Sequence, residues 1–318
     1  MVEGVAVFAG TAYFRRDDSH YFLAVSLVVP GSQIPFVQEK DKDNATLDIA
    51  GVVLEGSKFP VGHLRDTVKL AVESAQQVRR KNVQYNTSFL LAPGSYHLKF
   101  VVRENRTGRM GTFETDVQVP DLRKVPLRSS SVVLSSLRVP ANGKNRGNNP
   151  LVGDQAELVP NVTHVFTQDQ HLYLQFEVYD AAKGKSAQPA ATTEVPAIDS
   201  PAGKNQGTDS SPKNQRGSIR VLTSVEFLQN NVKVYESKPI VATEVTIPQR
   251  KAVIFQLDLP LQTLKPGFYT CQVNIIDDVS GNYAFPRWAM LIKDASPTPA
   301  PAATPAASNA SSSSSSIQ

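Results

Sequence analysis

Three short segments of the first half of the chain recur, in the same order, in the second half, and this internal repeat limits the folds open to the chain. In the clearest match, Leu91-Ala-Pro-Gly-Ser-Tyr96 corresponds to Leu264-Lys-Pro-Gly-Phe-Tyr269. The other matches pair Phe14–Tyr21 with Phe166–Tyr173, and Arg80–Tyr85 with Arg250–Phe255. Three collinear matches favour the tandem duplication of one structural unit over chance similarity.

Each unit has the pattern of an all-β domain. Apolar, aromatic and β-branched residues alternate or run together over strand length in Tyr21–Val29, Thr46–Leu54, Val83–Leu91 and Tyr96–Val102. Between residues 66 and 73, apolar residues fall at every second position, which favours a strand over a helix, with one short helical turn near 74–79 left open. Strands every 8 to 12 residues predict two tandem immunoglobulin-like, fibronectin-III-like β-sandwiches.

The repeated Pro-Gly-x-Tyr motif is the most informative local signal. Proline and glycine turn the chain at a sandwich corner, and the tyrosine then opens a core strand with its hydroxyl placed to bond back to the backbone. This is the tyrosine corner of Greek-key sandwiches, so a structural role is expected for both copies. The residues concerned are Pro93, Gly94, Tyr96, Pro266, Gly267 and Tyr269.

Turn residues also predict hairpins. The pair Asn230-Asn231 lies between two strand-like runs, and asparagine tolerates the positive φ of a tight type I′ turn. Two loops of equal length end in Gly108 and Gly281, which suit the left-handed position of a bulged hairpin.

Breaks in composition divide the 318 residues into two sandwiches, a connector and a tail. The connector, 122–150, is expected to contain the first strand of the second sandwich, which also holds a long disordered loop. The tail is rich in Pro, Ala and Ser and is expected to be disordered. The predicted boundaries are 1–121, 122–150, 151–293 with the loop 181–217, and 294–318.

Composition and motifs argue against an enzyme or a membrane-spanning protein. There is no apolar run of 18 residues, and the single cysteine, Cys271, excludes an intrachain disulfide or a cysteine-based zinc site. Because Cys271 follows Tyr269 by two residues on one expected strand, it is expected to be a buried, inert thiol. No HExxH, GxSxG, P-loop or Rossmann pattern occurs, so we expect no cofactor and no catalytic residue.

Two acidic clusters are weak candidates for calcium, because carboxylate oxygens are its preferred ligands. They are Asp41 with Asp43, and Asp277 with Asp278. The first cluster does not fit the EF-hand template, and a solvated turn is the competing interpretation.

The net charge of +4 gives no reason to expect nucleic acid as a partner, but it is unevenly distributed. The connector alone carries six basic residues and no acidic one. We interpret it as a solvated linker, with weak contact to an anionic polymer or lipid headgroup as the alternative. The six residues are Arg123, Lys124, Arg128, Arg138, Lys144 and Arg146.

Several stretches share turn and strand motifs with one known group of proteins, among them Tyr85–Tyr96, Val102-Arg-Glu-Asn-Arg-Thr-Gly108, Gly111-Thr-Phe-Glu114, Val119-Pro-Asp121, Ser130–Ser136, Pro160–Phe166 and Phe176-Glu-Val-Tyr179. In these motifs, and over about residues 5–292, the chain resembles the C-terminal, non-catalytic region of VWFA-related proteins of Acidobacteria. The resemblance rests on turn and strand motifs, and Asp278-Val-Ser-Gly-Asn282 lacks the last Ser of the von Willebrand A metal motif, so the A domain itself is absent. It implies an immunoglobulin-like fold and no assigned site residues. The N-terminus has no signal peptide, so an extracytoplasmic location is expected only if the chain belongs to a longer exported parent.

Three functions compete. The first is a non-enzymatic interaction or spacer module of a bacterial envelope or secreted protein, with an unidentified protein or glycan as partner. The second is an accessory module that binds the substrate of a hydrolase, which an exposed row of aromatic side chains on one sheet would favour. The third is a truncated fragment of a VWFA-related protein whose partner domain lies upstream.

Overall fold

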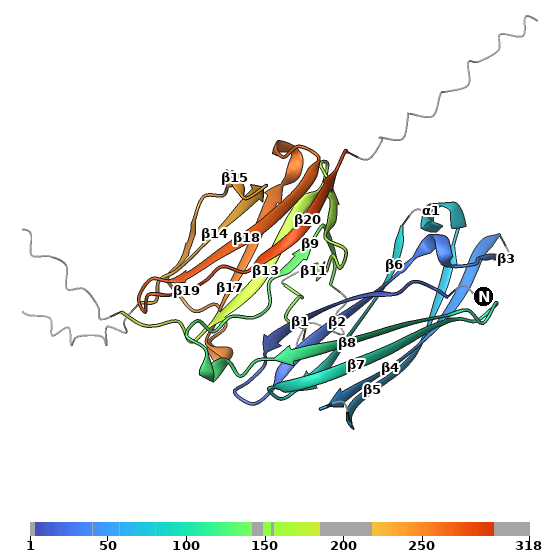
Figure 1. The fold of residues 1–318 in the computed structure, drawn as a ribbon, viewed down its shortest axis with the longest axis horizontal. Coiled ribbons are helices and arrows are strands. Elements are labelled where there is room, and N and C mark those ends of the chain that lie inside the picture. Colours follow the sequence, from blue (N-terminus) through green and yellow to red (C-terminus); the bar gives the residue numbers. More distant parts are fainter. Residues whose placement is uncertain are drawn as a thin grey trace, which may run out of the picture.

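The computed structural model describes residues 4–39, 41–56, 58–79, 81–141, 149–153, 156–184 and 218–295. The described chain is all-β and forms two sandwiches that follow one another along the sequence (Figure 1). The expected helical turn is α1 (Ala75–Arg79), the only α-helix in these ranges. Within the same ranges, no helix is long and apolar enough to cross a membrane.

In the first sandwich, a three-stranded sheet packs on a five-stranded one. The smaller sheet has the order β1-β2-β6; the larger runs β3-β4-β7-β8, with β5 also paired to β4. The strands are β1 (Phe8–Arg15), β2 (Tyr21–Pro30), β3 (Val37–Glu39), β4 (Lys42–Glu55), β5 (Phe59–Val72), β6 (Asn82–Leu91), β7 (Gly94–Glu104) and β8 (Met110–Val119).

The second sandwich packs the sheet β17-β13-β9 against the sheet β12-β20-β18-β14-β15, with β16 and β19 paired to β14 and β18. A small hairpin, β10-β11, lies beside it. The strands are β9 (Val133–Ser135), β10 (Leu137–Pro140), β11 (Ala156–Val159), β12 (Val165–Thr167), β13 (His171–Tyr179), β14 (Val221–Gln229), β15 (Val232–Glu236), β16 (Ile240–Ala242), β17 (Ala252–Pro260), β18 (Gly267–Asp277), β19 (Asn282–Ala284) and β20 (Arg287–Lys293).

The two sandwiches have the same strand order, as a duplicated unit requires. The run β5-β4-β7-β8 of the first corresponds to β15-β14-β18-β20 of the second, and β2-β6 corresponds to β13-β17. Equivalent backbone bonds close the ends of β2 and β13: Gly31 donates to the carbonyl of Lys81 at 2.9 Å, and Asp180 donates to that of Lys251 at 3.0 Å. Both acceptors lie in the second repeated segment, so this segment has the same place in both sandwiches.

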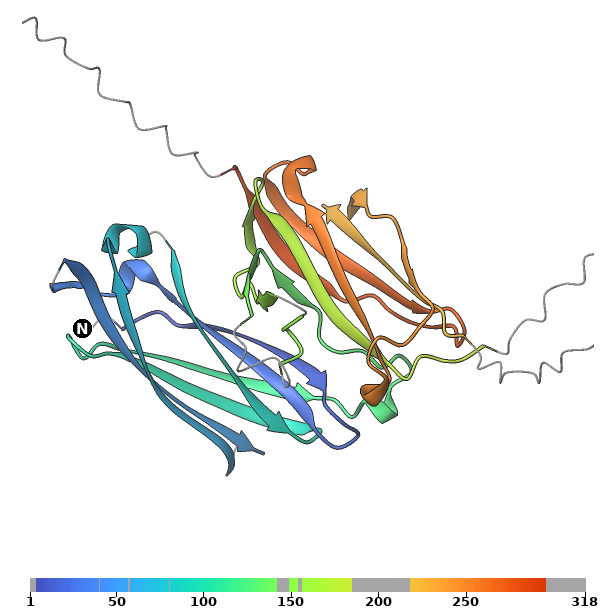
Figure 2. The ribbon, with the colours of Figure 1, turned by 180° about the vertical axis from the view of Figure 1, so that it is seen from behind.

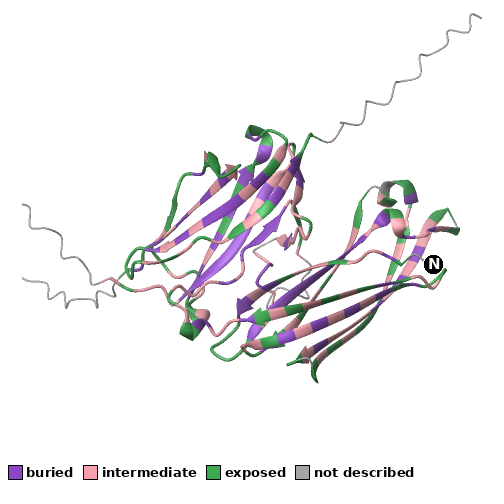
Figure 3. Cartoon of the chain, viewed as in Figure 1, coloured by how far each residue is buried: buried purple, intermediate pink, exposed green. Residues whose placement is uncertain are grey.

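Alternation along the strands places one apolar core between the sheets of each sandwich (Figure 3). In the first sandwich, Leu23 of β2 and Leu98 and Phe100 of β7 are fully buried. In the second, Phe176 of β13 stacks on Phe255 of β17 with ring centroids 5.1 Å apart.

Both tyrosines of the repeated motif make the hydrogen bond that the sequence predicts. The Tyr96 hydroxyl donates to the carbonyl of Ala92 at 2.8 Å, and the Tyr269 hydroxyl donates to that of Lys265 at 2.7 Å. Each bond spans four residues and fixes the turn before a central strand, β7 or β18, while the ring lies in the core.

Tyr96→Phe and Tyr269→Phe are each expected to lower the free energy of unfolding by about 1 kcal/mol, since each removes one neutral hydrogen bond and leaves a carbonyl unpaired. Urea unfolding followed by circular dichroism would measure the loss. Tyr283→Phe is the matched control, because the Tyr283 side chain is 65% exposed. Equal stability of all three variants would contradict a structural role for the corners.

The loops after β7 and β18 are also alike. Gly108 and Gly281 have φ of 70° and 73°, and each donates to the carbonyl of the residue that begins its loop, Glu104 or Asp277. The buried carboxylate of Glu104 accepts from Arg106 N and Thr107 N, both at 2.7 Å. The two loops are therefore bulged hairpins capped from within by an acidic side chain, and Asn230-Asn231 forms the tight turn expected, with φ of 50° and 64°.

Several predictions fall outside the described residues. They are the loop 181–217 apart from 181–184, the tail 294–318 apart from 294–295, and the connector residues Lys144 and Arg146.

Candidate functional site

The two sandwiches meet along β1, and the connector runs beside this strand (Figure 2). Tyr13 and Ser131 exchange two hydrogen bonds: Tyr13 N–H donates to Ser131 Oγ at 3.0 Å, and Ser131 N–H donates to the Tyr13 carbonyl at 3.0 Å. Two residues later, β9 begins and pairs with β13. Backbone hydrogen bonding thus connects the smaller sheets of both sandwiches through the connector.

Apolar side chains of both sandwiches share clusters at this contact. Phe14, at the end of β1, is fully buried in a cluster with residues of the second sandwich. From the opposite side, Tyr179 and Ala252 belong to the core cluster of the first sandwich. We call this contact the interdomain joint; it comprises Phe14, Arg15, Val133, Leu151, Leu158, Glu177, Tyr179, Asp180, Arg250 and Ala252, with Arg128 at its rim.

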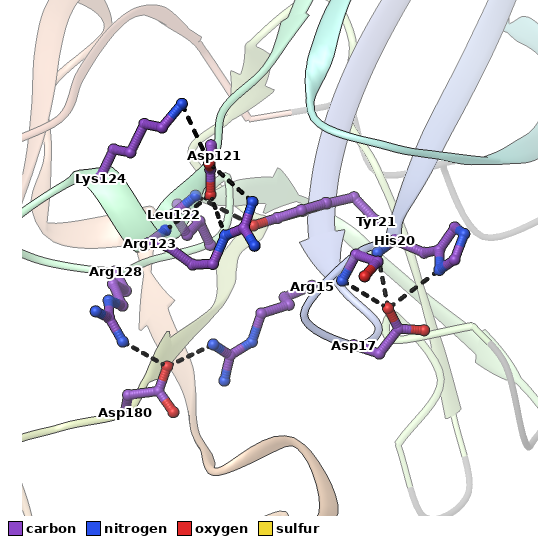
Figure 4. Close-up of polar contacts among 11 residues, drawn as sticks. Arg15, Asp17, His20, Tyr21, Asp121, Leu122, Arg123, Lys124, Arg128 and Asp180 are labelled. Atoms are coloured by element: carbon purple, nitrogen blue, oxygen red, sulfur yellow. Dashed lines mark hydrogen bonds and ion pairs between the residues drawn. The ribbon is translucent and has the colours of Figure 1, made fainter.

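Arg15 is the central charged residue of the joint, and its side chain is only 6% exposed. Its Nη1 lies 2.5 Å from Asp180 Oδ2, which also accepts from Arg128 Nη1 at 3.0 Å (Figure 4). Its guanidinium carbon lies 4.5 Å from the ring centroid of Tyr179, whose hydroxyl accepts from Arg15 N–H. Burial raises the pKa of Asp180, but the hydrogen bonds from Arg15 and Arg128 outweigh it and lower that pKa overall.

Arg250 forms the second half of the cluster and exchanges backbone contacts with Arg15. Arg15 Nη2 donates to the Arg250 carbonyl at 2.5 Å, and Arg250 Nη1 donates to the Arg15 carbonyl at 3.3 Å. Arg250 Nη2 also lies 2.9 Å from Oε1 of Glu177, whose side chain is fully buried. Within the described residues, Glu177 Oε2 has no hydrogen-bond donor. Burial raises the pKa of Glu177, and Arg250 opposes this shift.

Polar and apolar contacts of this kind connect the two sandwiches directly. Arg15 reaches across to Asp180 and to the Arg250 carbonyl, and Arg250 reaches back to the Arg15 carbonyl while it pairs with Glu177 of its own sandwich. Losing one partner of these pairs leaves an uncompensated buried charge. A rotation of one sandwich against the other would break several of these bonds at once. The joint therefore pairs its buried cations, Arg15 and Arg250, with the carboxylates of Asp180 and Glu177.

A pocket of about 260 Å³ opens beside the joint between the two sandwiches. Small residues of β1 and β2, including Gly10 and Ala24, form one wall, and His164 and Trp288 belong to the other. Burial lowers the pKa of His164. The volume is below the range of about 300–1,000 Å³ typical of small-molecule sites. Trp288, on β20, is only partly buried and packs against the core of the second sandwich.

The structure gives the weak calcium candidates local roles in turns. Asp277 caps its hairpin by accepting from Ser280 Oγ at 2.8 Å, and Asp278 pairs with Arg220 at 3.4 Å. Asp43 Oδ2 accepts from Ala75 N at 2.5 Å, and Asp41 sits in an exposed turn with φ of 65°. Within the described residues, no group of three or more His, Cys, Asp or Glu side chains could hold a metal.

The interpretation of the connector as solvated needs correction at Arg128, which belongs to the rim of the joint. Arg123 and Lys124 pair with Asp121 at 2.8 and 3.5 Å, and the hydrogen bond from Arg123 lowers the pKa of Asp121 to about 2. Arg138 lies over the ring of Tyr173, 4.0 Å from its centroid. Two carboxylates outside the connector, Asp121 and Asp180, thus pair with three of its four described cations.

Cys271 is fully buried in the second core beside Tyr269, as expected from its position on β18. Burial raises the pKa of its thiol to about 12. It therefore carries almost no thiolate at neutral pH and is unreactive there.

No family model matches the chain. No curated protein matches it either. Among solved structures, β-glucuronidase 2 of Bacteroides uniformis is similar over 35% of this chain and 13% of its own, with 10% identity and a TM-score of 0.24. The fibronectin(III)-like modules of Clostridium thermocellum CbhA are similar over 87% of both chains, with 12% identity and a TM-score of 0.21. The chain thus spans a small part of the glucuronidase. At these TM-scores the sandwich architecture rests on the strands and sheets described above.

Proposed function

We propose that the chain is a non-enzymatic structural spacer that holds two immunoglobulin-like sandwiches in one fixed arrangement and presents their outer faces to partners. The observation that carries this proposal is the interdomain joint, above all the buried Arg15, which bridges to Asp180 and to the Arg250 carbonyl of the second sandwich. Domains joined only by a flexible linker move relative to each other by default, whereas a buried, specified contact suppresses that motion.

The proposed setting is the envelope or the secreted fraction of a bacterium, as part of a longer exported protein. This follows from the resemblance of the strand and turn motifs to the non-catalytic region of VWFA-related proteins. A rigid double sandwich suits such a setting because it keeps a neighbouring domain at a constant distance.

Distance measurements between two spin labels test the rigidity. The labels go on Thr112→Cys in β8 and Lys238→Cys in the second sandwich, both exposed positions. The native Cys271 stays unlabelled because it is buried. We expect one narrow distance distribution in the double variant. A broad distribution would contradict the spacer proposal, and turnover by the purified protein in a hydrolase panel would contradict its non-enzymatic part.

A further inference from the structure

The outward face of the larger sheet of the second sandwich carries an unbroken apolar row across four strands. Leu222 of β14 lies opposite Val241 of β16 and Ile276 of β18, and Ile276 lies opposite Tyr283 of β19. Directly opposed residues in a sheet place their side chains on the same face. That face is the outer one, because the next residues along β14 and β18 are in the core. We call these four residues the apolar row.

The row ends in two exposed aromatic rings. Tyr283 is 65% exposed and Phe285 is 45% exposed, and their rings stack with centroids 5.1 Å apart and an interplanar angle of 23°. Two stacked, outward-facing rings hold each other in place, so a ligand that packs on them need not order them first.

A set of polar residues, which we call the polar ladder, lies next to the apolar row on the same face and begins two residues away along β14 and β18. Ser224 lies opposite Asn274, and Glu226 lies opposite Gln272, which lies opposite Arg287. The side chains are tied together: Asn274 Nδ2 donates to Ser224 Oγ at 3.0 Å, Gln272 Nε2 donates to Asn274 Oδ1 at 2.7 Å, and Arg287 Nε donates to Gln272 Oε1 at 2.6 Å. These bonds orient the amides in a defined way.

The ladder keeps hydrogen-bonding capacity for a ligand. The amide oxygen of the half-buried Asn274 accepts one bond from the described residues and can accept a second, whereas Gln272 is only 8% exposed and holds its neighbours Asn274 and Arg287 in place. The two terminal nitrogens of Arg287 and the hydroxyl proton of Ser224 make no bond within the described part of the chain. Fixed donors and acceptors therefore lie beside an apolar strip, the combination that ligand sites use for orientation and affinity.

The charge balance of the face selects an uncharged ligand. Lys233 lies 3.6 Å from Glu226 and 2.5 Å from Glu236, so these carboxylates and the cations Lys233 and Arg287 cancel. A charged polymer would therefore not be attracted, because the face has no net charge of the opposite sign. The apolar row is also much smaller than the 20 to 30 residues that each side of a stable protein interface supplies.

We infer that this face binds a neutral polysaccharide. Sugar rings would pack their C–H faces on Tyr283, Phe285 and the apolar row, while their hydroxyls exchange hydrogen bonds with the ladder. The inference does not depend on the spacer role, since a flexible pair of sandwiches could carry the same face.

Affinity electrophoresis in native gels that contain soluble β-glucan, xylan or mannan tests the inference, with polygalacturonate as the anionic comparison. We expect at least one neutral polymer to retard the full chain and polygalacturonate to leave it unretarded. Tyr283→Ala and Phe285→Ala should each weaken binding at least tenfold. Both side chains are exposed, so unchanged urea unfolding would show that the variants fold.

Phe268→Ala is the matched control. Phe268 is an aromatic residue on the same face, 75% exposed, but it lies eight residues from Ile276 along β18, a separation of about 27 Å. Its removal should leave the retardation unchanged. The inference is overturned if none of the neutral polymers retards the chain, if only polygalacturonate does, or if Tyr283→Ala binds as well as the original chain.

Discussion

Replacing Arg250 by alanine is expected to lower the free energy of unfolding by about 3–5 kcal/mol, the range for breaking a buried ion pair by removal of one partner. The variant leaves the fully buried Glu177 carboxylate without its cation and removes the hydrogen bond to the Arg15 carbonyl. Urea unfolding at pH 7, followed by circular dichroism and by the fluorescence of Trp288, would measure the loss.

Arg220→Ala is the matched control for this variant. Arg220 also pairs with an aspartate, Asp278, at 3.4 Å, but the two side chains are 57% and 50% exposed. Exposed pairs contribute at most about 1 kcal/mol, so Arg220→Ala should be nearly neutral. Equal losses in the two variants would show that the joint adds no more stability than a surface pair.

The same pair predicts a dependence on pH. Burial raises the pKa of Glu177 above its ordinary value of 4.5, against the pull of Arg250, so at a pH between the unfolded-state and folded-state pKa values the folded chain binds a proton there that the unfolded chain has released. The stability that Glu177 contributes is therefore complete below pH 4.5 and falls as the pH rises through its folded-state pKa. Glu177→Gln lacks this titration, so its stability relative to the original chain should improve from pH 4.5 to pH 7.

Removing the cation should strengthen that dependence. In Arg250→Ala the Glu177 carboxylate has lost its ion pair, so the cost of the variant should be largest at pH 7 and smaller near pH 4.5, where Glu177 can be protonated. Adding Glu177→Gln to Arg250→Ala should restore part of the lost stability at pH 7. A pH-independent cost, with no recovery in the double variant, would assign the effect of Arg250 to packing alone.

The parts of the fold predictable from the sequence are those set by local chemistry. The Pro-Gly-x-Tyr corners depend on a bond across four residues, and the Asn230-Asn231 turn depends on the tolerance of asparagine for positive φ. The repeat predicted two copies of one structural unit, and the aromatic residues that end the three matches do occupy equivalent strands, β2 and β13, β6 and β17, and β7 and β18. Each of these signals lies within a few residues of the structure that it specifies.

The joint could not be predicted in the same way, because its partners are far apart in sequence. Arg15 pairs with Asp180 across 165 residues and with the carbonyl of Arg250 across 235. The sequence around each of these three residues is typical of a charged residue on the surface. The one available signal was Glu177, an acidic residue within the apolar strand β13, where a charge is expected only if a partner reaches it.

The binding face was hidden for a related reason. Tyr283 and Phe285 follow a hairpin loop and carry no motif, and they join the row only because β19 pairs with β18 in one register. A shift of one residue would turn Tyr283 to the other face. The spacing of residues along the chain cannot predict such a row, because the row crosses strands that are distant in sequence.

Phe14→Ala is expected to lower the free energy of unfolding by about 3–5 kcal/mol and to uncouple the unfolding of the two sandwiches. Phe14 is fully buried among residues of both, including Val133 and Leu158 of the second, so truncation opens a cavity in the joint itself. The original chain should unfold in one calorimetric transition, because neither sandwich can open without exposing the joint. In Phe14→Ala we expect two transitions, with the first sandwich melting at the lower temperature.

Phe100→Ala separates uncoupling from simple destabilisation. Phe100 is as deeply buried as Phe14, but it lies in β7, in the core of the first sandwich. Its truncation should cost a similar amount while the joint stays closed, so the chain should still melt in one transition at a lower temperature. Two transitions in Phe100→Ala, or one in Phe14→Ala, would mean that the joint does not couple the sandwiches, and a spacer of fixed geometry would then need another source of rigidity.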